Sequence, residues 1–200
     1  MEKQEEKQAM TIWQKLIIIL SIIVVLICAG IYYSRFIATT GLQVKEYTIK
    51  NDKIPDSFHG AKIIHISDLH YKTTYYQKEV QVLVKKINEL NPDLVILTAD
   101  LFDKDTKYKN EDFEVLAKEL SKIKPSIGKY AISGNHDIQI SEWETVIKNS
   151  GFINLNDTFD TIYMNSLKPL LLVGVSSSLN NMKDINDRLK PATDYIKSIA

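Results

Sequence analysis

The longest apolar run in the chain lies near its N-terminus, over residues 16–33, and reads LIIILSIIVVLICAGIYY. Ser21 is its only clearly polar residue, and Trp13 and Tyr33 stand at its two ends, as aromatic residues do at a membrane interface. A helix of about 18 residues, rising about 1.5 Å per residue, is long enough to cross a hydrocarbon core of roughly 30 Å. The pattern predicts a transmembrane anchor over residues 16–33, preceded by an N-terminal flank of residues 1–15.

A cleaved signal peptide is the alternative interpretation of this run. The run is long for the apolar region of a signal peptide, and no clear cleavage site of small residues follows it. Cys28 suggests lipidation, but the bulky Ile27 precedes it where a small residue is expected. We therefore expect the segment to be retained as an anchor.

The basic residues around the run bear on its orientation. Lys3, Lys7 and Lys15 precede it, and Arg35 follows it directly. Basic residues are preferentially retained on the cytoplasmic side of a membrane. The slight excess before the run predicts a single-pass protein in the membrane whose main domain lies on the outer, exoplasmic side.

After the anchor, short apolar runs of strand length alternate with segments of helical periodicity. Residues 34–60 are predicted to form a connector that contains a first strand, VKEYTI, at Val44–Ile49. The other strand-like runs are Ala61–Ile66, Asp93–Thr98, Lys129–Ser133 and Leu170–Val175.

Three helices are predicted between and after these runs, because apolar residues recur there at intervals of three and four. The apolar positions of the first two helices are Val80, Leu83, Val84, Ile87 and Leu90, then Phe113, Leu116, Ala117 and Leu120. Thr74 with Gln77 resembles a capping box for the first helix, Ser141 begins the third helix, and Gly151 ends it. Strands that alternate with helices predict an α/β fold with a parallel sheet, in which ligands gather at the carboxyl ends of the strands.

Composition excludes some classes of function. The chain has 25 acidic and 25 basic residues, so no nucleic acid or other polyanion is expected as a partner. Its single cysteine lies within the apolar run, which excludes a disulfide framework and a zinc site built from cysteines.

Polar residues follow three of the predicted strands at the point where each ends. Asp68 and His70 follow the strand at 61–66, Asp100 follows the next strand, and the sequence GNHD at 134–137 follows the third. In an extended segment residues i and i+2 point the same way, so Asp68 and His70 can face one ion. Carboxylate, imidazole and amide oxygen suit Mn, Fe or Zn ions. Each piece alone also fits an ordinary turn or helix cap, and only their ordered repetition at strand ends indicates a metal site.

These three motifs resemble those of the calcineurin-like metallophosphoesterases, which carry Asp-x-His, Gly-Asp and Gly-Asn-His-Asp/Glu at successive strand ends. The lead-in DSFHGAKIIHISDLHY is similar to the membrane-anchored branch of that family, which includes phosphoesterases of lipid-linked sugar diphosphates. The resemblance covers residues 54–175. It implies a fold in which a β-sandwich is flanked by helices.

The resemblance also implies the roles of the motif residues. Asp68 and His70 would bind a first metal ion, Asp100 would bridge two divalent ions, and Asn135 would bind the second. The implied reaction is hydrolysis of a phosphate ester or anhydride by a water that the two ions activate.

His136 and Asp137 would be the catalytic residues, without being metal ligands. His136 would face the phosphate and the leaving group, and Asp137 would hold the His136 ring. A phosphorylated small molecule or a lipid headgroup is the expected substrate.

Two departures from the family pattern bear on these expectations. Ala99 stands where the family usually has glycine, which strains the loop if that position needs an unusual backbone angle. The family completes its site with late histidines, whereas no histidine follows His136 in this chain. Residues 61–200 are therefore expected to be the N-terminal portion of a truncated metallophosphoesterase domain. The alternative function is a catalytically incomplete, non-catalytic membrane protein.

Two further polar residues are expected to have ordinary structural roles. His65 lies inside a predicted strand and is expected to be packed. Asp103 follows Asp100 closely and is interpreted mainly as a loop residue, with a supporting role beside the metal ligands as the alternative.

Overall fold

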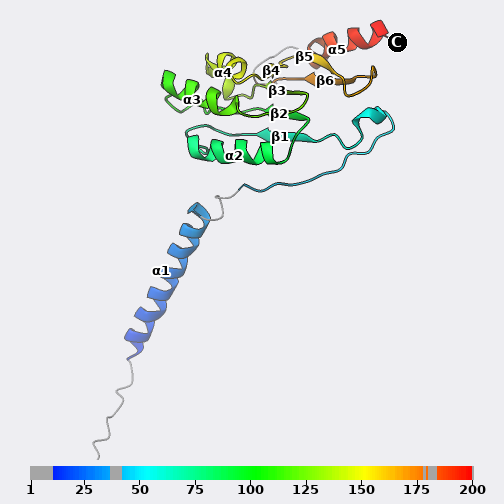
Figure 1. Cartoon of the computed structure of the whole chain (residues 1–200). Helices are drawn as coiled ribbons and strands as arrows, with labels where there is room; N and C mark the ends of the chain where they lie inside the picture. The colour runs from blue at the N-terminus through cyan, green and yellow to red at the C-terminus, as the bar shows by residue number, and fades with distance from the viewer. Residues whose placement is uncertain (1–10, 37–41, 178, 180–183, 200) are drawn as a thin grey trace, which may run out of the picture. The chain divides into compact units, whose positions relative to one another are not determined.

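The computed structural model describes residues 11–36, 42–177, 179 and 184–199 (Figure 1). The chain divides into two compact units, Met1–Thr48 and Ile49–Ala200. Most of the predicted N-terminal flank, including Lys3 and Lys7, lies outside the described residues.

The first unit contains helix α1, Ile12–Phe36, which is long and apolar enough over Ile12–Ser34 to cross a membrane. The helix begins four residues before the predicted anchor because a capping box precedes it. The Thr11 backbone N–H donates to Gln14 Oε1 at 2.9 Å, and the Gln14 N–H donates to Thr11 Oγ1 at 3.4 Å.

The strand predicted at Val44–Ile49 is wrong. Residues 42–50 adopt neither helix nor strand, and Tyr47 is 83% exposed. Strand composition alone is insufficient here, because a strand needs a neighbour to accept its backbone hydrogen bonds, and no described strand pairs with this segment.

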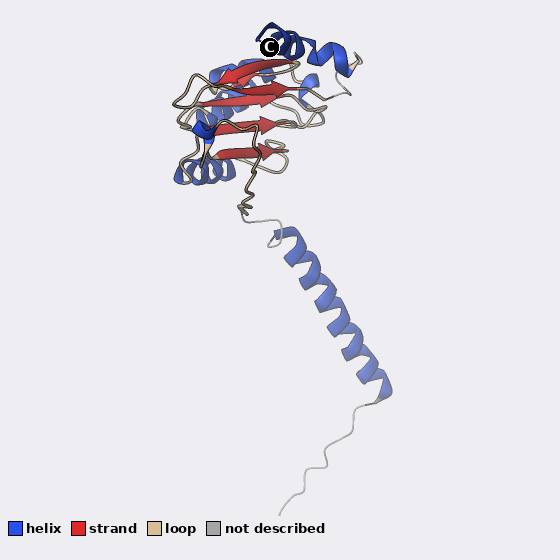
Figure 2. Cartoon of the chain, turned by 90° about the vertical axis from the view of Figure 1, so that its right-hand side faces the viewer, coloured by secondary structure: helices blue, strands red, loops and turns tan. Residues whose placement is uncertain are grey.

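The second unit is built on a four-stranded sheet that confirms the predicted parallel order (Figure 2). Its strands, in the spatial order β1-β2-β3-β4, are β1 Ile63–Ser67, β2 Leu94–Thr98, β3 Gly128–Ile132 and β4 Ile153–Asn154. The helices that follow the first three strands are α2 Gln77–Glu89, α3 Asn110–Leu120 and α4 Trp143–Asn149. Short 3-10 helices lie at Asp56–Phe58 (η1) and Asp137–Gln139 (η2).

Helices α2, α3 and α4 cover one face of this sheet. Most of the apolar positions predicted for α2 and α3 are buried there against alternate residues of the strands, including Val95 and Ala131; Phe113 is half-buried, and Leu90 lies outside this cluster as the C-cap of α2. Both predicted helix starts are wrong. Helix α2 begins at Gln77, and the Tyr76 N–H donates to Glu79 Oε2 at 3.1 Å; α4 begins at Trp143, with Glu142 as its N-cap in place of Ser141. The predicted end of α4 at Gly151 is confirmed, since Gly151 adopts a φ of 78° and donates its N–H to Lys148.

The other face is covered in part by a two-stranded antiparallel sheet, β5 Thr158–Ile162 with β6 Leu170–Gly174. The strand predicted at 170–175 is thus confirmed. Ile162, Leu170 and Leu172 pack with Leu94 and Tyr130, which belong to β2 and β3. This pair of sheets is the sandwich layer within the described residues, and helix α5, Ile185–Ile199, follows it.

The prediction that His65 is packed is wrong, because the second sheet contacts β2 and β3 and leaves the same face of β1 open. His65 is exposed there, and its Nε2 lies 2.6 Å from Thr98 Oγ1 on the neighbouring strand.

Candidate metal centre

Backbone hydrogen bonds continue past the ends of the strands and hold the three polar loops together. The Asp68 N–H donates to Ala99 O at 3.2 Å, and the His70 N–H donates to Asp100 O at 3.0 Å. On the other side, the Ala99 N–H donates to Ile132 O at 3.0 Å. The carboxyl ends of β1, β2 and β3 therefore form one continuous platform for the side chains that follow them.

Asp68, His70 and Asp100 converge on this platform. One ligand atom from each lies within 4.8 Å of the others, a spacing that one metal ion can join. Their backbones are left-handed, with φ values of 53°, 41° and 49°. The extended geometry expected for Asp68 and His70 is therefore wrong. Their side chains come together because the backbone turns sharply at each residue at the carboxyl edge of the sheet. Non-glycine residues in this region cost about 1–3 kcal/mol each and gather at functional sites.

Ala99 shares this strained geometry, with a φ of 61°. It is the position at which the resemblance led us to expect glycine. The methyl group of Ala99 thus sits on a backbone that glycine adopts at no steric cost. The backbone strain that the sequence predicted at Ala99 is therefore confirmed.

Asp103 belongs to the site, although its sequence position alone indicated a loop residue. One ligand atom each of His70, Asp103 and His136 lie within 4.8 Å of one another. Asp103 Oδ1 is 3.5 Å from His136 Nδ1, and Asp103 Oδ2 is 3.8 Å from His70 Nδ1. The two imidazole rings meet edge to face, with centroids 5.2 Å apart. The only sequence signal for this role was the spacing of three residues after Asp100.

The surroundings of Asp103 favour its ionised carboxylate form. A hydrogen bond from the Asp105 backbone N–H lowers the pKa of the Asp103 carboxyl, and the nearby His136 and His70 rings lower it further, against the opposing effect of burial. Asp103 is therefore an anion at neutral pH between two imidazoles.

Asp137 binds the backbones of two loops, and its predicted role of holding the His136 ring stays a prediction. It is 1% exposed; its Oδ1 accepts the Phe102 N–H and its Oδ2 accepts the Gly134 N–H, both at 2.9 Å. Burial raises the pKa of the Asp137 carboxyl, and these two hydrogen bonds oppose the rise. Asp137 thus ties two loop backbones together, whereas the His136 ring has its Nδ1 near Asp103 and accepts the Lys104 N–H at 3.3 Å.

The GNHD loop is pressed against Asp100. The His136 N–H donates to Asp100 Oδ1 at 3.1 Å, which fixes the loop to the central strand end. A Cβ at Gly134 would lie 2.0 Å from Asp100 Oδ1 and 2.5 Å from the Asp100 backbone nitrogen. Asn135, between these two residues, is half-buried in the same loop.

The residues present fit a divalent metal ion. His70 Nδ1 is buried and has no hydrogen-bond partner among the described residues, a state that a metal ligand tolerates and an ordinary buried nitrogen does not. Carboxylates combined with imidazoles are the ligands of Mn, Fe and Zn ions. Two groups of described residues could hold a metal ion, and His70 belongs to both. They are Asp68, His70 and Asp100, and His70, Asp103 and His136.

Comparison with known proteins gives one matching family model and several relatives. The family model described as calcineurin-like phosphoesterase matches residues 61–196. The chain is 25% identical to the uncharacterized metallophosphoesterase YkuE of Bacillus subtilis over 173 residues, which are 85% of this chain and 60% of that protein.

Two further relatives carry more descriptive names. A transmembrane protein with metallophosphoesterase domain of Danio rerio is 28% identical over 60% of this chain and 28% of its own length. The UDP-2,3-diacylglucosamine pyrophosphatase LpxG of Chlamydia muridarum is 30% identical over 42% of this chain and 26% of its own length. The chain spans 60% or less of the length of each of these three relatives.

Proposed function

This chain belongs to the calcineurin-like phosphoesterase family, and from this premise we propose that it is a membrane-anchored, metal-dependent phosphoesterase that hydrolyses a phosphate ester or anhydride. The observation that carries the proposal is the convergence of Asp68 and His70, which follow β1, with Asp100, which follows β2, to within 4.8 Å. Folding does not require metal-binding side chains to gather on strained backbones. Such a group of side chains is expected at a site that binds a ligand.

The proposed site divides its residues by role. Asp68 and His70 would hold a first divalent ion, Asp100 would be shared with a second, and Asn135 would serve the second. When bound, such ions supply Lewis-acid polarisation of the phosphoryl group and lower the pKa of water. The protein contributes the fixed positions of these ligands, which the hydrogen bonds between the three loops maintain.

His136 is the proposed general acid. Water attacks phosphorus and releases a proton to the solvent, and the bond from phosphorus to the leaving oxygen breaks. The His136 ring, whose Nδ1 accepts the Lys104 N–H, gives that oxygen the proton of its Nε2. Asp103 Oδ1 lies 3.5 Å from His136 Nδ1 and bears on the direction of the His136 ring. Asp137 contributes by holding the loop that carries His136.

The proposed substrate is a phosphorylated lipid or a lipid-linked diphosphate, with a phosphorylated small molecule as the simpler case. Helix α1 is apolar enough to cross a membrane, and a short connector joins it to the family domain. One relative is named as a pyrophosphatase of UDP-2,3-diacylglucosamine, and another as a transmembrane protein. The proposed location of the domain is the exoplasmic side, from the basic residues before the anchor.

The test uses the full chain purified in detergent. Hydrolysis of p-nitrophenyl phosphate, bis-p-nitrophenyl phosphate and UDP-2,3-diacylglucosamine is measured with and without Mn²⁺. Asp100→Asn and His136→Ala are compared with matched controls at exposed positions, Asp52→Asn and His59→Ala. We expect a metal-dependent rate that falls at least about 100-fold in the two site variants and is unchanged in the controls. Equal, metal-independent rates in all five proteins would refute the proposed function.

A further inference from the structure

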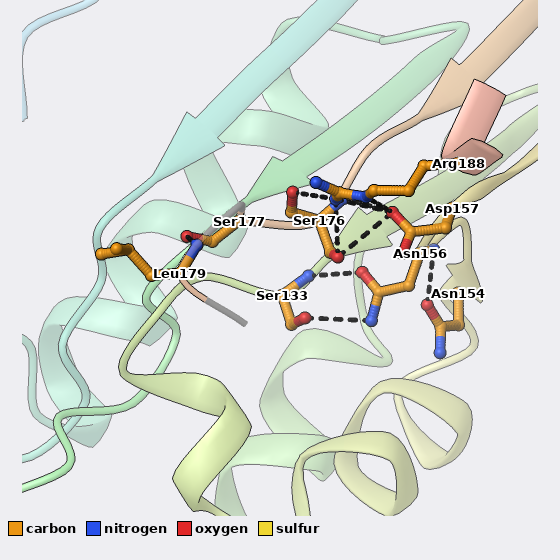
Figure 3. Close-up of polar contacts among 8 residues, drawn as sticks. All are labelled: Ser133, Asn154, Asn156, Asp157, Ser176, Ser177, Leu179 and Arg188. Atoms are coloured by element: carbon orange, nitrogen blue, oxygen red, sulfur yellow. Dashed lines mark hydrogen bonds and ion pairs between the residues drawn. The ribbon is translucent and has the colours of Figure 1, made fainter. Parts of the chain in front are cut away.

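A polar network behind the candidate site links the GNHD loop to the last described helix (Figure 3). It begins at Ser133, the residue between strand β3 and Gly134. The Ser133 N–H donates to Asn156 Oδ1 at 2.8 Å, and Asn156 Nδ2 donates to Ser133 Oγ at 3.0 Å. The Ser133 carbonyl accepts the Ser177 N–H at 3.3 Å. All three polar groups of Ser133 are therefore engaged by later segments of the chain.

These contacts replace strand pairing where the sheet ends. Strand β4 is two residues long and ends at Asn154, with the Leu155 N–H still donating to Ala131 O at 2.9 Å. One residue further on, the Asn156 side chain takes over the pairing with Ser133. The start of the GNHD loop is thus held by the side chain of Asn156, and the position of Asn156 depends on the residues that follow it.

The next residue, Asp157, is held by a buried arginine. Arg188 on α5 is 5% exposed, and its Nε and Nη2 donate to Asp157 Oδ1 at 2.9 and 2.7 Å. Arg188 Nη2 also donates to Ser176 O and to Ser176 Oγ. The Ser176 N–H and hydroxyl both donate to Asp157 Oδ1, at 3.1 and 3.2 Å. Arg188 therefore clamps the segment after β4 to the segment after β6.

The backbone at this point needs such a clamp. Asp157 has a φ of 55°, a left-handed conformation that costs a non-glycine residue free energy. Loss of the arginine would remove two hydrogen bonds and a positive charge from the partly buried Asp157 carboxylate, which is strongly unfavourable. The segment would then relax, and Asn156 would move with it.

We propose that Arg188 is a positioning residue for the GNHD loop: through Asp157 and Asn156 it fixes Ser133, and thereby the directions of Asn135 and His136. The proposal concerns the site of the proposed phosphoesterase and rests on that function for its catalytic consequence only. The structural consequence, that Arg188 on α5 fixes the position of the GNHD loop, follows from the hydrogen bonds alone. Arg188 touches neither substrate nor ion.

The variants are chosen to separate positioning from general destabilisation. Arg188→Met removes the clamp, and the milder Arg188→Lys keeps a positive charge but cannot donate to Asp157 and Ser176 as a planar fork does. Asn156→Leu breaks the next link. Gly151→Ala is the matched control, because alanine at a φ of 78° strains the fold at the opposite, amino-terminal edge of the sheet.

The first readout is hydrogen exchange of the full chain in detergent, followed by mass spectrometry of a peptide covering residues 131–140. We expect both Arg188 variants and Asn156→Leu to raise exchange in this peptide by about tenfold, and Gly151→Ala to leave it unchanged. Because this readout needs neither metal nor substrate, it tests the proposal even if the wild-type chain proves inactive.

The second readout is kcat, KM and Mn²⁺ affinity. Loss of an outer support of a metal site typically lowers metal affinity or activity by about 10- to 100-fold. We expect a loss of that size in kcat with KM little changed, and a combined Arg188→Met, Asn156→Leu variant no worse than the poorer single variant, since both act through one path. If the Arg188 variants differ from Gly151→Ala in neither loop exchange nor kcat, the inference is wrong. A wild-type chain that shows no metal-dependent hydrolysis would overturn the proposed function and leave the exchange result to decide the positioning role.

Discussion

Replacing Gly134 by alanine tests how tightly the GNHD loop is built against the central strand end. The φ of Gly134 does not lie in the left-handed region, so alanine is tolerated by the backbone itself. The obstacle is contact: the new Cβ would lie 2.0 Å from Asp100 Oδ1, 2.5 Å from the Asp100 nitrogen and 2.8 Å from Ala99 Cβ. Two of these three atoms belong to the backbone or to a proposed metal ligand.

The magnitude follows from these distances. An ordinary contact of this kind is about 3.4 Å or more, so the loop and Asp100 must separate by roughly 1 Å. Overpacking of this size costs about 1–3 kcal/mol, which in a domain of about 150 residues lowers the Tm by roughly 2–12 °C. A misplacement of about 1 Å at a reactive site costs on the order of 100-fold in rate.

The assay combines thermal unfolding by circular dichroism with titration of Mn²⁺ by calorimetry, both on the full chain in detergent. Gly60→Ala is the control: Gly60 has a φ of 78° and no atom within 4 Å of a Cβ, so alanine adds backbone strain without contact. We expect both variants to lower the Tm and only Gly134→Ala to lose Mn²⁺ binding. A Gly134→Ala protein that keeps the wild-type Tm and Mn²⁺ affinity would refute the reasoning.

Three further predictions concern stability. Ala99→Gly should leave the free energy of unfolding unchanged or raise it by up to about 1 kcal/mol, because glycine adopts the φ of 61° without strain. The same change at Ala117, inside helix α3, should lower the free energy of unfolding by about 1 kcal/mol or more. Urea unfolding measures both, and equal losses in the two variants would show that Ala99 is not strained. Burial lowers the pKa of Lys129 to about 8, so the unfolded chain binds the proton more readily between about pH 8 and the ordinary lysine pKa of 10.5. Stability should therefore rise over that window in the wild type and rise less in Lys129→Met, as urea midpoints at a series of pH values would show; identical pH profiles would count against it. Gly151→Ala should lower the free energy of unfolding by about 1–2 kcal/mol through strain, and an unchanged urea midpoint would exclude it.

The local elements were largely readable from the sequence. The apolar spacing of α2 and α3 is an intrinsic property of a 3.6-residue period, and it placed the buried positions, such as Val80 and Leu116, on the correct faces. The short runs that became β1, β2 and β3 were bounded by turn residues, and their alternation with helices predicted the parallel order. Because parallel order brings the carboxyl ends of strands to one edge, the meeting of Asp68 and Asp100 was also predictable.

Tertiary structure decided the rest, for reasons that residue patterns do not carry. Val44–Ile49 has strand composition but pairs with no strand in the part of the chain that the structure describes, and His65 is exposed because the second sheet stops short of β1. Asp103 joins the site through its contact with His136, and Asp137 binds the backbone of Phe102, 35 positions away in the sequence. Arg188 lies more than fifty residues beyond His136, and its clamp on Asp157 exists only once α5 packs near the ends of β4 and β6. The sequence alone determined which side chains reach the sheet edge; the fold determined how they are held, because holding depends on neighbours that are distant along the chain.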